Sequence, residues 1–318
     1  MGDITRLFFA TDLHGSEKCF LKFLNAGKFY KSNVLIMGGD ITGKLMIPIV
    51  KEPNGGYHAT YSDSRHEANS ESELHELESQ IRLAGFYPYQ TTPEQMAELQ
   101  HDEKKVGSLF KEVMLDTLRR WVGLAEQRLK GTGISVYITG GNDDLPEITP
   151  ILQSSSFVID PEEKVIDLTP HHKMLSTGWS NPTPWKTPRE CTEDELAAKI
   201  EGMTSQIGDF RTAVFNIHVP PIDSGLDMCP KLDETLKPVI VNGEILMAPG
   251  GSKAVRSAIE KYQPLLGLHG HIHESKGFVK IGRTFCVNPG SEYSEGILRG
   301  VIVDLEDGKV KNFLLTQG

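Results

Sequence analysis

The chain has 318 residues, with 33 lysines and arginines against 43 aspartates and glutamates, which gives a formal net charge of −10. This length can bury the core of one large domain or two smaller ones, and the acidic balance disfavours a general nucleic-acid or membrane-surface binder, because phosphate backbones attract basic surfaces. It does not exclude a phosphorylated substrate, since bound metal ions add positive charge locally.

The N-terminal part of the chain is predicted to fold as strand, helix and strand. A continuous apolar run predicts a buried strand over 4–10, and the helical spacing of the next apolar residues predicts a helix over 16–26. A second apolar run, 34–37, predicts another buried strand. This order is typical of a βαβ unit. Such folds place ligands at the carboxyl ends of their strands.

Residues 45–130 interrupt this pattern and are predicted to form a mostly helical insertion. The stretch 47–61 has turn residues and little periodicity, whereas 67–83 has an acidic helical pattern. A long amphipathic pattern then begins at a proline suited to the first turn of a helix and continues over 93–130. Its apolar face is expected to pack against the core, with a lid or a homo-oligomer contact as the alternative.

After the insertion the strand pattern resumes, and the whole chain, 1–318, is predicted to be a single domain of the α/β class. Helices are predicted at 192–207 and 252–262. Strands are predicted at 134–139, 157–159, 164–168, 173–177, 213–217, 265–269, 276–281, 284–287 and 299–304.

Metal-type ligands directly follow the predicted strands at five places. These segments are Asp12-Leu13-His14, Gly39-Asp40, Gly141-Asn142-Asp143, His218 and Gly270-His271-Ile272-His273. Carboxylate and amide oxygens combined with imidazole nitrogens suit ions such as Mn, Fe and Zn. A carboxylate such as Asp40 can bridge two cations, and two ions about 3.5–4 Å apart can clamp a phosphoryl group for in-line attack. The set therefore predicts a dinuclear metal centre.

These segments, in this order, resemble the calcineurin-like metallophosphoesterases, whose signature is D-x-H, G-D, G-N-H-[D/E], a lone His and G-H-x-H. The turn Asn288-Pro289-Gly290-Ser291 is also similar to one common in that family. The resemblance covers most of the chain except 45–130. It implies a β-sandwich flanked by helices, a four-layer α/β/β/α fold. It also implies a hydrolase that cleaves a phosphodiester or phosphomonoester with a hydroxide bridging two divalent metals.

By position, the resemblance implies two metal sites that share one carboxylate, and it leaves the metal open among Mn, Fe and Zn. The first set is Asp12, His14, Asp40 and His273. The second set is Asp40, Asn142, His218 and His271. The resemblance also implies a catalytic role for Asp40, Asn142 and His218, with Asn142 close enough to contact the substrate phosphate.

The third segment departs from the family pattern, because Asp143 stands where a His is usual. That His is credited with contacting the phosphate and helping to protonate the leaving oxygen. Asp143 could take this catalytic role only if burial or neighbours such as Asp144 kept it protonated. We therefore expect a preference for diesters or good leaving groups, or another acid such as His171 or His172.

Two alternatives to this enzyme remain open at this point. The first is a non-catalytic protein-binding scaffold on the same fold, which only the departure at Asp143 favours. The second is a nucleotide-binding P-loop, because the segment 38–44 nearly matches that motif. Leu45, however, stands where the motif needs Ser or Thr to reach Mg²⁺.

The compartment and the partner are predicted from weaker features. The cysteines Cys19, Cys191, Cys229 and Cys286 are scattered, with no C-x-x-C pair, which is typical of a reducing compartment. The N-terminus lacks the pattern of a signal peptide, and no apolar run approaches the ~20 residues of a membrane span. We expect a cytoplasmic enzyme whose partner is a small or nucleotide-like phosphoester.

Overall fold

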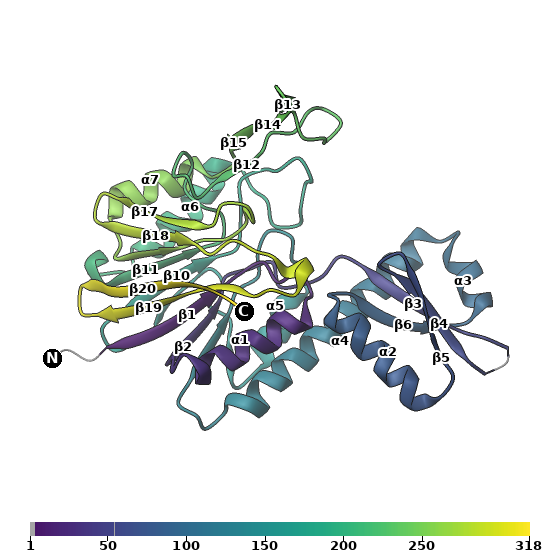
Figure 1. The fold of residues 1–318 in the computed structure, drawn as a ribbon. Helices are drawn as coiled ribbons and strands as arrows, with labels where there is room; N and C mark the ends of the chain where they lie inside the picture. The colour runs from purple at the N-terminus through teal and green to yellow at the C-terminus, as the bar shows by residue number, and fades with distance from the viewer. Residues whose placement is uncertain (1–3, 54) are drawn as a thin grey trace.

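Two β-sheets form the body of the protein (Figure 1), and the computed structural model describes residues 4–53 and 55–318. The first sheet has the strand order β20-β19-β1-β2-β7-β8 and the second the order β10-β11-β16-β18-β17. The first sheet contains β1 (Thr5–Ala10), β2 (Val34–Met37), β7 (Ser135–Ile138), β8 (Val158–Ile159), β19 (Arg299–Glu306) and β20 (Lys309–Gln317). The second contains β10 (Lys173–Thr177), β11 (Ala213–Ile217), β16 (Leu266–Leu268), β17 (Gly277–Ile281) and β18 (Thr284–Asn288).

The central strands of both sheets run parallel, so their carboxyl ends lie together at one edge of each sheet. In the first sheet β1, β2, β7 and β8 are parallel neighbours, and in the second β10, β11, β16 and β18 are. The two edges meet, because the Nδ1 atom of His218, just after β11, lies 2.9 Å from the carbonyl oxygen of Gly38, just after β2. A side chain that follows one of these strands therefore faces side chains from the other sheet.

The sheets share a core, and helices pack on their outer faces. Alternation along β1 places Leu7 and Phe9 in the core between the sheets and Phe8 and Ala10 in the core under the helices. Helices α1 (Glu17–Phe29), α4 (Glu103–Leu129) and α5 (Ile148–Ser154) contribute to the outer core of the first sheet. Helices α6 (Glu193–Thr204) and α7 (Lys253–Tyr262) do so for the second. The predicted mixed α/β class is confirmed.

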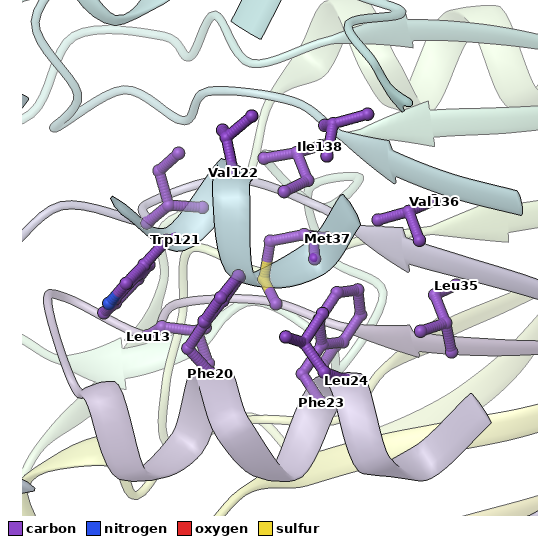
Figure 2. Close-up of a cluster of buried hydrophobic side chains, with 14 of the residues drawn as sticks. Leu13, Phe20, Phe23, Leu24, Leu35, Met37, Trp121, Val122, Val136 and Ile138 are labelled. Atoms are coloured by element: carbon purple, nitrogen blue, oxygen red, sulfur yellow. The ribbon is translucent and has the colours of Figure 1, made fainter. Parts of the chain in front are cut away.

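Packing between α1, α4 and the first sheet holds the segment that follows β1 (Figure 2). The rings of Phe20 and Trp121 stack with centroids 4.3 Å apart, and Leu13 is buried in the same cluster. The Ser16 side chain accepts a hydrogen bond from the Cys19 amide and so caps α1 two residues after His14. Because Leu13 is buried, its neighbours Asp12 and His14 are held at the carboxyl end of β1.

The inserted segment contains a sheet that the sequence pattern did not predict. The strands β3 (Met46–Lys51), β4 (Tyr57–Tyr61), β5 (Ser64–Ala68) and β6 (Tyr87–Thr91) pair in the order β5-β4-β3-β6. They share a small core with α2 (Glu71–Leu83) and form the lobe beside the main body in Figure 1. These strands are short and partly exposed, so the alternation of apolar and polar residues that identifies a strand in a sequence is weak in them.

The long helix predicted over 93–130 is two helices, α3 (Pro93–Leu99) and α4, and this correction has a local cause. The Asp102 side chain accepts a hydrogen bond from the Lys105 amide and begins a new helix. The apolar side of α4, including Met114, Leu118 and Trp121, packs in the main core. The oligomer contact expected through this region stays a prediction, and the apolar side of α4 is already occupied.

Several further elements lie outside the predicted set. Helix α5 and the C-terminal strand β20 are two of them, and a projecting arm over 228–249 is the third (Figure 1). The arm is built from β12 (Met228–Pro230), β13 (Ile240–Val241), β14 (Glu244–Ile245) and β15 (Met247–Pro249). Within residues 4–53 and 55–318, no helix combines the length and apolar character needed to cross a membrane.

Candidate metal centre

The five predicted segments meet where the carboxyl edges of the two sheets join. The side chains that follow the strands there are Asp12 and His14 after β1, Asp40 after β2, Asn142 after β7, His218 after β11, and His271 and His273 after β16. Most of these residues are buried, and His271 and His273 are partly exposed. The fold therefore gathers at one point residues that are up to 261 positions apart in the sequence.

Two separate groups of three side chains at this point could each hold a metal ion. The first group is Asp12, His14 and His273, and the second is Asp40, His218 and His271. Within each group one ligand atom per residue lies within 4.8 Å of the others. The amide oxygen of Asn142 lies 2.7 Å from Nδ1 of His271, so it adds an oxygen beside the second group.

Asp40 links the two groups. Its Oδ2 atom lies 3.4 Å from Nε2 of His218 in the second group and 3.7 Å from Nε2 of His14 in the first. The two histidine atoms Nε2 of His218 and Nδ1 of His14 are buried without a hydrogen-bond partner. Buried polar atoms rarely stay unpaired, so these two nitrogens are expected to have a partner. Imidazole nitrogens and carboxylate oxygens together bind divalent transition-metal ions, and a metal ion is therefore a suitable partner.

The backbone at the site adopts left-handed conformations that residues other than glycine generally avoid. Asp12, His14, Asp40 and His271 have φ angles of 55°, 42°, 50° and 67°. Such left-handed conformations cost of order 1–3 kcal/mol each and concentrate at functional sites. Here they turn the chain sharply after β1, β2 and β16, and so direct four predicted ligands toward one another.

Glycines beside the ligands allow the approach of neighbouring segments. A Cβ atom added to Gly141 would lie 2.2 Å from Oδ1 of Asp40, and one added to Gly270 would lie 2.5 Å from Oδ2 of Asp12. Both distances are well inside van der Waals contact, so a side chain at either position would displace a predicted ligand. Because glycine lacks a side chain, it permits this close contact.

The charges of the site are strongly coupled. Burial lowers the pKa of the His218 imidazole, but the carboxylates of Asp40 and Asp12 outweigh it and raise that pKa to about 10. Burial raises the pKa of Asp12, yet the neighbouring His218 and His273 rings lower it to about 2. Burial and the charge of His218 lower the pKa of His271 to about 4. Without a metal ion, a proton on His218 would therefore balance the negative charges of Asp40 and Asp12. A bound cation would replace this proton and balance the same two charges.

Asp144 stabilises the segments that carry the predicted ligands. The sequence analysis gives it no role beyond that of a neighbour of Asp143. Its carboxylate accepts hydrogen bonds from the amides of Ile41, Thr42 and Gly141 at 3.0, 2.8 and 2.8 Å, and from the Thr42 hydroxyl at 2.6 Å. Asp144 thus ties the segment after β2 to the segment after β7. Asp144 occupies the position of the acidic residue that ends the G-N-H-[D/E] signature, so the motif could have indicated its importance from the sequence.

Asp144→Ala is expected to lower the free energy of unfolding by about 3 kcal/mol or more, because it leaves buried donors unpaired, each of which costs about 1–3 kcal/mol. Chemical denaturation followed by circular dichroism measures this change. Asp167→Ala, which removes an exposed carboxylate paired only with Lys173, serves as the control and should change stability by under about 0.5 kcal/mol. A loss below about 1 kcal/mol for Asp144→Ala would contradict the supporting role.

The same hydrogen bonds exclude the P-loop alternative. The amides of Ile41 and Thr42 donate to Asp144, and the amide of Gly43 donates to the Tyr87 hydroxyl at 2.6 Å. A P-loop needs such amides for phosphate and leads into a helix, whereas this segment leads into β3.

Asp143 lies at the site and forms an ion pair there. Its Oδ2 atom contacts the Lys44 ammonium and lies 3.7 Å from Nδ1 of His14. With His14 and Asp40 it makes a third group of possible metal ligands, which overlaps the other two. Burial lowers the pKa of Lys44, but the hydrogen bond and charge of Asp143 outweigh it and raise that pKa. The Asp143 carboxylate is therefore held in an ion pair with a cation, at the position where the resemblance expects an imidazole.

His171 and His172 do not supply the missing acid, and that suggestion was wrong. They precede β10, which runs parallel to β11, so they lie at the edge opposite His218. Five strand residues at roughly 3.3 Å each separate the two edges. His172 is buried there, with Nδ1 2.8 Å from the Thr169 hydroxyl.

Two further segments complete the surroundings of the ligands. The Asn288 amide donates to the carbonyls of Gly270 and Ile272 at 3.1 and 3.0 Å and so fixes the loop after β16. The Tyr293 ring packs against His14 with centroids 4.7 Å apart. The sequence reading noted the Asn288 turn and missed Tyr293, which belongs to no motif.

Comparison with known proteins finds a partial sequence match and a shared fold. No family model matches it. The uncharacterized protein MJ1162 of Methanocaldococcus jannaschii is 31% identical over 159 residues, which cover 49% of this chain and 64% of that protein. The match therefore spans about half of this chain and less than two thirds of the relative.

Solved structures share the fold over nearly the whole length. One crystal structure matches with a TM-score of 0.57 and 15% identity, covering 99% of both chains. TT1561 of Thermus thermophilus matches with a TM-score of 0.52 and 11% identity, again over 99% of both. At these identities the likeness shows a common fold and no more. A novel archaeal phosphodiesterase is a more distant neighbour, with a TM-score of 0.33 and 10% identity, covering 98% of this chain and 100% of its own, and that score carries no weight for function.

Proposed function

We propose that this chain is a phosphoesterase of the calcineurin-like type that works with two divalent metal ions. The observation that carries the proposal is the pair of ligand groups joined at Asp40. The order of the five motifs, which resembles that family, supports it as well. We further propose a single four-layer domain over 1–318 that carries 45–130 as an insertion.

The residues present fit two divalent ions. We propose that Asp12, His14, Asp40 and His273 hold one and that Asp40, Asn142, His218 and His271 hold the other. When bound, two such ions supply a hydroxide nucleophile and neutralise the charge of the phosphoryl group. Mn, Fe and Zn all suit this mixture of oxygen and nitrogen ligands.

The protein's own side chains then position the substrate. Lys44 lines the cavity over the site, where its ammonium pairs with Asp143 and would attract an anionic phosphate. The Asn142 amide donates to the Thr187 hydroxyl at 2.8 Å, which fixes its oxygen toward His271. Because Asp143 is paired with Lys44 and stands where the resemblance expects a proton-donating His, the proposed substrate is a diester or another ester with a good leaving group.

The non-catalytic scaffold is the second candidate, and the geometry favours it less. Six of the seven predicted ligands fall into the two groups that could hold a metal ion, which supports the enzyme over the scaffold. A scaffold has no need for four backbone positions at positive φ aimed at one point. A cytoplasmic location remains part of the proposal and rests on the scattered cysteines.

Hydrolysis of bis-p-nitrophenyl phosphate tests the proposed function. The purified protein with added Mn²⁺ is expected to release p-nitrophenol, to lose this activity after treatment with EDTA, and to regain it when Mn²⁺ is restored. Spectrophotometry at the absorbance of p-nitrophenolate measures each step. Activity that persists undiminished after the metal is removed would contradict a metal-dependent mechanism.

A further inference from the structure

A cavity of about 660 Å³ opens directly above the two metal-ligand groups. Its floor contains ligand-type side chains from both groups, such as His14 and His271. The loop 183–188 forms one wall of this cavity, and the part of the arm from Pro230 to Pro238 forms another. A molecule bound at the floor would therefore lie beside both of these walls.

Both walls present apolar side chains to the cavity. On the loop, the Trp185 indole is 64% exposed, and on the arm Leu236 is 48% exposed. Leu232 and Pro238 line the same wall as Leu236. Exposed apolar surface in a concave site beside polar groups is typical of a ligand pocket that buries an apolar part of its ligand.

Trp185 is held in a fixed relation to the metal-ligand groups. The Glu190 carboxylate accepts hydrogen bonds from the Thr183 hydroxyl and, at 2.8 Å, from the Thr187 amide, so it closes the loop on either side of Trp185. The Thr187 hydroxyl in turn accepts a hydrogen bond from the Asn142 amide at 2.8 Å. The loop backbone that carries Trp185 is thus tied to a predicted metal ligand, so the indole is presented near the site of a ligand that also reaches the metals.

We propose that the cavity binds an aromatic group of the phosphoester, a nucleobase or an aryl ring, which stacks on Trp185 while the phosphoryl group lies at the metals. This inference rests on the proposed function and adds the substrate class. A flat ring suits the indole face because stacking needs no hydrogen-bond complement. The cations Lys44 and Lys186 line the same cavity, which suits a ligand with an anionic phosphate at one end.

Two phosphonates test the site without hydrolysis, because their carbon–phosphorus bond does not break. Isothermal titration calorimetry in the presence of Mn²⁺ compares phenylphosphonate with methylphosphonate, which share the anionic head group. The wild-type protein is expected to bind phenylphosphonate roughly tenfold more tightly, within the range that stacking of one ring contributes. Trp185→Ala is expected to remove this advantage and Trp185→Phe to keep most of it, with methylphosphonate unchanged in both.

Phe29→Ala is the matched control, because Phe29 is an aromatic residue 78% exposed on α1, outside the residues that line the cavity. It should leave both affinities unchanged. If methylphosphonate binds but phenylphosphonate binds no more tightly, or keeps its advantage in Trp185→Ala, the aromatic site is wrong and the proposed function stands. If neither phosphonate binds although bis-p-nitrophenyl phosphate is hydrolysed, this inference is wrong and the proposed function stands. If neither phosphonate binds and no hydrolysis occurs, both are wrong.

Discussion

Asp40→Asn is expected to reduce kcat/KM for bis-p-nitrophenyl phosphate at least about a thousandfold. The substitution keeps the size of the side chain and removes the charge that faces both His14 and His218. Asp40 is the one residue in both proposed metal sets, so its substitution weakens the binding of both ions. Several kcal/mol of transition-state stabilisation depend on these ions. Initial rates at saturating Mn²⁺ measure the effect.

Two companion variants give this result its meaning. His218→Ala removes a ligand of the second group only and should also lose hydrolysis, since both ions act on one phosphoryl group. Asp167→Asn neutralises a carboxylate that is 74% exposed at the side chain, and it should leave the rate within about twofold of the wild type. Thermal unfolding of each variant shows that the fold is kept. More than a tenth of wild-type activity in Asp40→Asn would rule out its bridging role.

Asp143→His is expected to change which leaving groups the protein tolerates. The wild type should hydrolyse bis-p-nitrophenyl phosphate at least about 100-fold faster than glycerol 2-phosphate, because an alkyl leaving oxygen needs a proton donor and general acids contribute about 10²–10⁴ in rate. A His at this position can supply the proton, so the ratio of the two rates should fall at least about tenfold. Parallel assays of p-nitrophenol and inorganic phosphate release measure it.

Asp143→Asn is the control for this change, because it also breaks the ion pair with Lys44 but offers no titratable donor. It should leave the ratio of the two rates near the wild-type value. An equal fall in the ratio for Asn and His would assign the effect to the lost ion pair. Comparable wild-type rates on the two substrates would show that another group already protonates the leaving oxygen.

The parts of the fold that position the site could be predicted from local patterns. Buried strands such as Val34–Met37 are continuous apolar runs, and their ends coincide with glycines and ligand-type residues. These patterns lie within a few consecutive residues, so they can be recognised in the sequence without knowledge of tertiary contacts. The placement of each predicted ligand directly after a strand is what allowed residues as distant as Asp12 and His273 to be grouped.

The parts that were missed depend on contacts between distant segments. The strand Ser64–Ala68 has the sequence SRHEA and is mostly exposed, so only its pairing with Tyr57–Tyr61 makes it a strand. The arm over 228–249 is likewise held by pairing of β12 with β15. The role proposed for Trp185 depends on a cavity that residues of the arm also line, and no local pattern connects the two segments.

The number and position of metal ions in a crystal of the protein soaked in Mn²⁺, located by anomalous scattering, test the dinuclear centre most directly. Two peaks about 3.5–4 Å apart are expected, one beside Asp12, His14 and His273 and the other beside His218 and His271, with Asp40 between them. A single peak, or peaks that do not flank Asp40, would contradict a dinuclear centre bridged by Asp40.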